Sequence, residues 1–181
     1  MKSKKAAMEM SVGTIVTIVL LMSVLILGIF LVNKIFGSAT NAIDLTDQQL
    51  EEEINKLFGN DEKFVIYPKT GLVEVEQGEL AAIGIGIKNL LEGEAGTSTF
   101  AYTTIVADTG TCIENEEQIE NWLSVGKTGD KIPIRVGDLY TEKIRFKIPE
   151  GNSICLARFR VEVYSEGYPY ASKTFDVEIK K

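Results

Sequence analysis

The feature that most constrains this chain is an uncharged apolar run near its N-terminus. Residues 12–32 read VGTIVTIVLLMSVLILGIFLV, which is 21 residues without a charge, proline, asparagine or glutamine. As a helix rising ~1.5 Å per residue, the run spans roughly 31 Å and matches a hydrocarbon core of about 30 Å. Its β-branched residues would favour a strand in water, but a lone strand in hydrocarbon leaves its backbone amides unpaired. We therefore predict a transmembrane helix over residues 12–36.

The charges are distributed unevenly about this run. Of the 19 basic and 26 acidic residues, four basic and one acidic lie in residues 1–37, a net of +3, so residues 38–181 carry 15 basic against 25 acidic, a net of −10. Lys2, Lys4 and Lys5 precede the apolar run, and positive residues favour the cytoplasmic side. We expect a single-pass protein of the cell membrane, with residues 1–11 a short basic cytoplasmic leader and the C-terminal domain extracellular.

A cleaved secretory signal peptide is the alternative to a retained anchor. The apolar core of such a peptide is usually only ~7 to 15 residues long and ends at a small-x-small cleavage site. Here the core is longer, and the residues that follow, Asn33-Lys34-Ile35-Phe36, do not resemble that site. Retention of the helix is the preferred interpretation.

From residue 63 onward the hydrophobic period is two, which is typical of antiparallel strands with one buried face. The alternating apolar positions are Phe64 and Ile66; Val73 and Val75; Ile83, Ile85 and Ile87; Ile144, Phe146 and Ile148; Phe159, Val161 and Val163; and Phe175, Val177 and Ile179. Two further runs, TSTFAYTTIVAD and KIPIRV, bring the expectation to about eight strands separated by turn signals. We predict an all-β, immunoglobulin-like sandwich over residues 63–181.

Two short helices are expected beside the strands. Residues 37–62 form a predicted linker with an amphipathic helix near 47–58, where Thr46 and Gln49 make a capping box and Gly59 is a C-cap. Its apolar face, made of Leu50, Ile54, Leu57 and Phe58, must bury against the chain's own domain, a neighbouring chain or the lipid surface. Packing on its own domain is preferred. The segment ENEEQIENWLSVG predicts a second helix that turns Ile119, Trp122 and Leu123 toward the sandwich.

The two cysteines, Cys112 and Cys155, both fall in the portion expected outside the cell. A disulfide persists in an oxidising space, so we predict that they pair. Closing a loop of this length stabilises a fold by about 4 kcal/mol in the chain-entropy model. Two buried free thiols are the alternative. The spacing is not the Cys-Trp-Cys pattern of antibody domains.

The composition excludes several kinds of chemistry. With no histidine in the chain, a Ser-His-Asp or Cys-His triad, a His-ligated metal and an imidazole pH switch are excluded. A net charge of −7 argues against nucleic acid, since phosphate contacts need a basic surface. We find no catalytic constellation and predict no enzyme activity, no cofactor and no metal.

Four motifs favour structural over chemical interpretations. Ile83-Gly84-Ile85-Gly86-Ile87 reads as a strand whose glycines face a crowded neighbour rather than as half of a dinucleotide fingerprint, and Gly126-Lys127-Thr128 reads as a turn. An acidic cluster reads as a solvated face rather than a calcium site; it comprises Glu114, Glu116, Glu117 and Glu120. Three tyrosines of the last hairpin could anchor a partner, but the preferred interpretation is that they cover the end of the sandwich; they are Tyr164, Tyr168 and Tyr170.

The N-terminal run KSKKAAMEMSVGTIVTIVLL places a short basic leader and then Glu9 directly before the long apolar helix. This arrangement resembles the class III signal peptide and assembly helix of type IV pilin-like proteins, especially archaeal ones. The predicted outer domain agrees with that family only in architecture. The resemblance implies that a class III signal peptidase removes the leader carrying Lys2, Lys4 and Lys5, and that Glu9 aids the docking of subunits.

The chain departs from the family pattern at the expected cleavage site, because no glycine precedes it. Cleavage after Lys4 would place Glu9 at mature position five, the family position, whereas cleavage after Lys5 would place it at four. The leading hypothesis is a non-catalytic pilin-like cell-surface subunit. Its expected partners are the lipid bilayer, the class III signal peptidase and copies of itself. The alternative is an unprocessed single-pass binding or adhesion module that forms no filaments.

Overall fold

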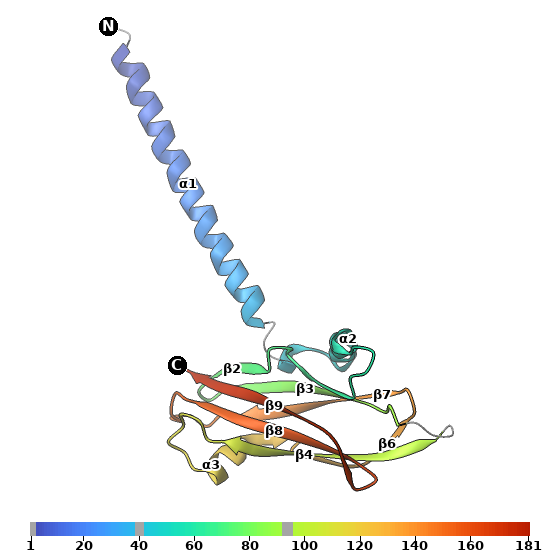
Figure 1. The fold of residues 1–181 in the computed structure, drawn as a ribbon. Coiled ribbons are helices and arrows are strands. Elements are labelled where there is room, and N and C mark those ends of the chain that lie inside the picture. The colour runs from blue at the N-terminus through green and yellow to red at the C-terminus, as the bar shows by residue number, and fades with distance from the viewer. Residues whose placement is uncertain (1–2, 39–41, 92–95) are drawn as a thin grey trace. The chain divides into compact units, whose positions relative to one another are not determined.

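The chain divides into two compact units, Met1–Ala39 and Thr40–Lys181. A computed structural model describes the backbone of residues 3–38, 42–91 and 96–181, and the side chains of these residues other than 3–12, 32–38 and 43. The first unit contains one helix, α1 (Ser3–Ser38), which includes the predicted span over residues 12–36. The second unit, here called the β domain, contains two sheets (Figure 1). The predicted fold class, an apolar N-terminal helix followed by a β-sandwich, is therefore confirmed.

The described part of the β domain contains nine strands in two sheets. Sheet A has the order β1-β3-β7-β5 and sheet B the order β2-β9-β8-β4-β6. The strands are β1 (Phe64–Tyr67), β2 (Leu72–Glu76), β3 (Leu80–Lys88), β4 (Thr97–Asp108), β5 (Leu123–Val125), β6 (Thr128–Arg135), β7 (Leu139–Lys147), β8 (Leu156–Ser165) and β9 (Tyr168–Lys180). Figure 1 shows β9, β8 and β4 running side by side.

The core lies between the inner faces of the two sheets and is built by the alternating residues that the sequence singles out. Its centre is aromatic. The rings of Phe159 and Phe175 stack with centroids 5.4 Å apart, and Phe146 packs 5.4 Å and 5.6 Å from them. Trp122 is buried beside Phe159. Buried rings of this size contribute large apolar areas, so this cluster anchors the sandwich.

Two details of the strand prediction were wrong. The chain was expected to pair its strands antiparallel, but β2 pairs parallel with β9, with Val73 opposite Val177. A short helix was expected within residues 114–126, and α3 covers Glu116–Glu120, but the strand β5 that follows it, which includes Leu123, was not predicted. The backbone amide of Lys147 donates to the carbonyl of Trp122. This bond brings the chain onto sheet A directly after the helix, with Ile119 and Trp122 buried as expected.

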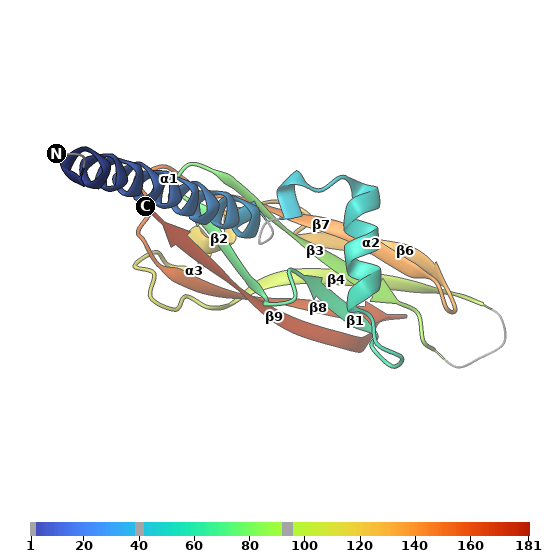
Figure 2. The ribbon, with the colours of Figure 1, turned by 90° about the horizontal axis from the view of Figure 1, so that it is seen from above.

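A short 3-10 helix, η1 (Ala42–Asp44), and the helix α2 (Asp47–Leu57) begin the β domain. The predicted capping box of Thr46 and Gln49 is present. The helix ends differently from the prediction, because its C-cap is Phe58 in an extended conformation and not Gly59. Helix α2 crosses over β3, as Figure 2 shows, so the amphipathic helix packs on its own domain.

The glycines of β3 allow this packing. A Cβ atom on Gly84 would lie 2.4 Å from Leu50 Cδ1, and one on Gly86 would lie 2.4 Å from Ile54 Cγ2. A small second core forms there on the outer face of sheet A; it comprises Ala42, Leu50, Ile54, Val65 and Ala82. Strand β3 is consequently buried on both faces. The expected reason for the two glycines, a crowded neighbour, is thus supplied by α2.

Candidate functional site

The most distinctive candidate is the apolar part of α1, Gly13–Leu31, which has a mean hydropathy of 2.9. None of this stretch is buried within the chain, and its large apolar side chains are 48–69% exposed. A helix that is apolar on every side belongs in a membrane or within a larger assembly. By length and composition, the stretch is able to cross a bilayer and is compatible with a membrane anchor or a signal sequence.

The polar side chains of this stretch are hydrogen-bonded within the helix. The Thr17 hydroxyl donates to the carbonyl of Gly13 at 2.7 Å, and the Ser23 hydroxyl donates to the carbonyl of Val19 at 2.8 Å. In hydrocarbon an unpaired hydroxyl is costly, and a bond to the carbonyl one turn earlier removes that cost. These hydroxyls therefore suit an apolar environment.

The predicted leader and assembly residues fall largely outside what the structure describes. Lys2 lies outside the described residues, and for Lys4, Lys5 and Glu9 the structure describes the helical backbone of α1 but not the side chains. Their roles remain predictions from the sequence.

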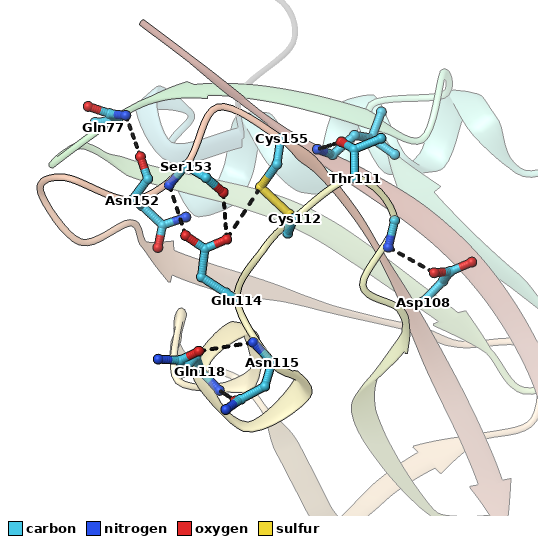
Figure 3. The surroundings of a disulfide bond; sticks show 12 residues. Gln77, Asp108, Thr111, Cys112, Glu114, Asn115, Gln118, Asn152, Ser153 and Cys155 are labelled. Atoms are coloured by element: carbon cyan, nitrogen blue, oxygen red, sulfur yellow. Dashed lines mark hydrogen bonds between the residues drawn. A yellow bond between two sulfur atoms is a disulfide. The ribbon is translucent and has the colours of Figure 1, made fainter.

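The predicted pairing of Cys112 with Cys155 is present (Figure 3). The disulfide joins the segment after β4 to the residue before β8, with the two Cα atoms 4.8 Å apart. Glu114 lies beside it and accepts hydrogen bonds from the backbone amide of Ser153, at 2.8 Å, and from its hydroxyl. Cys112, Cys155 and Glu114 could in principle gather a metal ion, but both sulfur atoms are committed to the disulfide. The geometry fits a structural staple.

The electrostatics of Glu114 also support a structural role for this residue. Burial raises the pKa of its carboxyl, but hydrogen bonds from the Ser153 hydroxyl and amide, together with weaker ones from the backbone at residues 113 and 114, more than offset this, so the pKa lies below its usual value. Hydrogen bonds to a carboxylate favour the charged form. The charged Glu114 therefore ties the Ser153 loop to the segment that carries Cys112.

The other acids of the predicted acidic face lie on α3, and one of them is paired. Glu116 and Glu117 occupy the first turn of α3, where the helix dipole favours negative charge. Glu120 forms an ion pair with Lys127 at 2.8 Å. The helix dipole and one ion pair thus account for these three acids.

The tyrosines of the last hairpin divide into structural and exposed groups. The Tyr170 hydroxyl donates to the carbonyl of Lys88 and accepts from the amide of Leu90, while its ring meets Phe100 edge to face. Tyr170 therefore covers the end of the sandwich. Tyr168 is 76% exposed. An open hollow of about 310 Å³ lies beside the hairpin and is lined by Tyr164, Pro169 and Tyr170 among others.

A buried cation that the sequence did not reveal fixes η1 and α2 to sheet A. Lys143 on β7 is nearly buried, and its ammonium group lies 2.9 Å from Asp47 Oδ1 and donates to the carbonyl of Leu45. The hydrogen bond from Lys143 lowers the pKa of Asp47. The signal was present as a lysine in a strand whose neighbour, β3, carries a glycine, Gly84, at the facing position. Its partner, 96 residues earlier, was not predictable by spacing.

Comparisons with known proteins leave the family open. No family model matches the chain, and no curated protein matches it. Similar solved structures include the alkylpurine DNA glycosylase AlkC from Pseudomonas fluorescens (14% identity, TM-score 0.32), a family 123 glycoside hydrolase from Clostridium perfringens (13%, 0.34) and a Niemann-Pick type C2 protein from Japanese carpenter ant (12%, 0.37). The matches cover 64%, 60% and 66% of this chain.

The same matches cover 29%, 22% and 90% of those three chains, so this chain spans less than a third of the first two. TM-scores at this level carry no argument about function. The functional inference therefore depends on the chain's own residues.

Proposed function

We propose that the chain is a non-catalytic, type IV pilin-like cell-surface subunit, held in the membrane by α1 and able to assemble with copies of itself through that helix. The observation that carries the proposal is the uncovered apolar stretch Gly13–Leu31. A stretch that is apolar on every side needs lipid in a single subunit and neighbouring helices in an assembly.

Glu9 supplies the proposed selectivity of assembly. It stands four residues before Gly13, at the start of the apolar stretch. An acidic side chain drawn to the bilayer centre costs ~2.5 to 3.5 kcal/mol on insertion scales for Asp. A cation on a neighbouring subunit, such as a newly formed N-terminal amine, removes much of that cost. Pairing with the cation would then fix the register of one helix against the next.

The proposed topology has the N-terminus in the cytoplasm and the β domain outside the cell. The lysines at positions 2, 4 and 5 support this orientation through the positive-inside tendency. The disulfide of Cys112 and Cys155 supports it too, because such bonds persist in oxidising compartments.

The test compares filament formation by the unsubstituted chain and by Glu9→Ala, each expressed in the same cells. We expect filaments in the sheared fraction to be lost, while the amount of chain in the membrane fraction is unchanged. Glu51→Ala is the matched control, because it removes an exposed carboxylate from α2, and it should leave filaments intact. Filaments that persist in Glu9→Ala, or that never form from the unsubstituted chain, contradict the assembly proposal.

A second candidate function is an unprocessed, anchored binding or adhesion module. The exposed Tyr168 beside the hollow at the last hairpin favours it, since exposed aromatics are common anchors in interfaces. The mass of the N-terminal peptide from native membranes separates the two candidates. A peptide beginning at Lys5 or Ala6 supports the pilin-like subunit, and one that retains Met1 supports the anchored module.

A further inference from the structure

Two exposed isoleucines flank the disulfide. Ile113 follows Cys112 in the chain, and Ile154 precedes Cys155. Among the described large apolar side chains of the β domain, these isoleucines rank first and third in exposure, at 88% and 60%, with Tyr168 second at 76%. Single exposed apolar residues are ordinary on protein surfaces. What distinguishes these two is that the structure brings them together.

Three successive links place the two isoleucines opposite each other. The segments Thr111–Glu114 and Ser153–Leu156 run in opposite directions. A backbone hydrogen bond joins residue 111 to 156, the disulfide joins 112 to 155, and hydrogen bonds to a carboxylate join 114 to 153 (Figure 3). This register leaves Ile113 facing Ile154. Cys155 is buried in the core, whereas the two isoleucines are exposed. We call Ile113 and Ile154 the isoleucine pair.

The same links hold the isoleucine pair in place. The disulfide on one side and the hydrogen bonds of Glu114 on the other restrict the backbone of both segments. Little conformational freedom is therefore left to lose when a partner binds. The Glu114 carboxylate is already occupied by the amide and hydroxyl of Ser153, so the charge next to the pair is satisfied. The isoleucine pair is thus a preformed apolar patch.

The hollow at the last hairpin lies at the opposite end of the β domain. Strand β8 begins at Leu156, directly after the disulfide, and ends at Ser165 beside the hollow. Its 10 residues, at ~3.3 Å each, put roughly 30 Å between the two places. Figure 1 shows β8 running from the end that carries α3 to the hairpin with β9. The hollow of about 310 Å³ has the size of a small ligand pocket, so it has room for a few side chains.

The walls of this hollow are ordered and leave no charge unpaired. Glu162 is the one acid among the described residues that line it. Its carboxylate accepts a hydrogen bond from the Tyr164 hydroxyl at 2.7 Å and lies 3.6 Å from the guanidinium of Arg160. The other lining residues are aromatic, aliphatic or small; they are Val163, Tyr164, Pro169, Tyr170, Ala171 and Ser172. An apolar side chain that enters the hollow therefore buries no unpaired charge.

We propose that the isoleucine pair of one copy of the chain docks in the hairpin hollow of the next copy. The partner is a second copy because the same domain carries both surfaces, and because the proposed assembly brings copies to a high effective concentration. A contact between two different patches passes from copy to copy and forms an open chain or a ring, not a closed pair. The proposal rests on the proposed assembly of copies and adds to it a contact between β domains.

The test is photo-crosslinking of the full chain in the membranes of cells that express it. The photoreactive residue benzoylphenylalanine replaces Ile113 in one variant. In the control variant it replaces Val136, an aliphatic residue that is 42% exposed elsewhere on the domain. In three further variants it replaces residues 20, 21 and 22 in turn. These point in directions about 100° apart on α1 and report contacts between copies through that helix.

We expect the probe at position 113 to give covalent dimers in which residue 113 is joined to residues 162–172 of a second copy, identified by mass spectrometry of the linked peptides. The probe at position 136 should give none. Adding Ile154→Asp to the position-113 variant should lower the dimer yield about tenfold, because an unpaired carboxylate would enter the hollow. Val125→Asp is the matched control, since it alters an exposed aliphatic residue elsewhere, and it should retain the yield. Protection of both cysteines from alkylation checks that each variant is folded.

Dimers through positions 20–22 without dimers through position 113 would overturn the docking proposal and leave assembly through α1 standing. An absence of dimers at all of these positions would overturn assembly itself and the docking with it. Docking would also be overturned by links from position 113 to lipid, to another protein or to a different surface of the second copy, and by an unchanged yield in the folded Ile154→Asp variant.

Discussion

Replacing Gly86 with alanine should destabilise the β domain by forcing α2 away from sheet A. The new Cβ atom would lie 2.4 Å from Ile54 Cγ2, 2.9 Å from Phe58 Cε2 and 3.1 Å from Val65 Cγ2. Separations below about 3 Å cannot be tolerated, so side chains or the helix must shift. Overpacking of this kind costs about 1–3 kcal/mol. We expect Gly86→Ala to lower the free energy of unfolding by that amount.

A double-mutant cycle with Ile54→Ala tests whether the contact with α2 is the cause. Ile54→Ala alone should cost about 2–5 kcal/mol, since it empties the centre of the small second core. In the double variant the worst clash is absent and the added methyl group occupies part of the space left by isoleucine. The double variant should therefore be more stable than the sum of the single effects predicts, by about 1–3 kcal/mol.

The assay is urea unfolding of the full chain in detergent micelles, followed by the fluorescence of Trp122. This residue lies in the core between the sheets, so it reports the unfolding of the β domain. Gly59→Ala is the control, because a Cβ atom there meets nothing within 4 Å, and its effect should stay within about 0.5 kcal/mol. Unchanged stability in Gly86→Ala, or strict additivity with Ile54→Ala, would refute the packing of α2 on β3.

Two further predictions concern the region of the disulfide. Replacing both Cys112 and Cys155 with serine should lower the free energy of unfolding by about 4 kcal/mol, given their separation of 43 residues; identical urea midpoints would show that the bridge does not restrain the unfolded chain. The pKa of Glu114 is lower in the folded state than its usual value of about 4.5, so its contribution to stability is present above about pH 4.5 and is lost as pH falls through the folded pKa. Urea unfolding from pH 7 to pH 3 should therefore show the stability advantage over Glu114→Gln shrinking on acidification, and an advantage independent of pH would contradict the role of its charge.

Local patterns were sufficient to predict much of this fold. The uncharged run predicted α1, and strict alternation predicted most strands, including Thr97–Asp108 with its observed bounds. The capping box at Thr46 marked the start of α2. Each of these features depends on residues within one continuous segment. Their physical causes are hydrocarbon burial along the apolar run, burial of one face of a strand and hydrogen bonding at a helix end.

Features that depend on distant residues were not predictable. The parallel pairing of β2 with β9 joins segments about a hundred residues apart, and nothing in either segment specifies a parallel partner. Lys143 lies on the outward side of β7, which alternation marks as polar, and it is buried because η1 and α2 cover it. The exposure of Leu80 and Val125 was hidden for the converse reason: these apolar residues occupy outward positions that alternation marks as polar.

The central claim is that the stretch Gly13–Leu31 stays in the mature chain and crosses a bilayer. Alkaline carbonate extraction of native membranes, with mass spectrometry of the N-terminal peptides, tests it most directly. We expect the chain to remain with the lipid pellet with residues 13–31 intact, and a chain lacking these residues to be released. Recovery of the full-length chain in the soluble fraction, or of a membrane-derived chain that begins after Leu31, would contradict the claim.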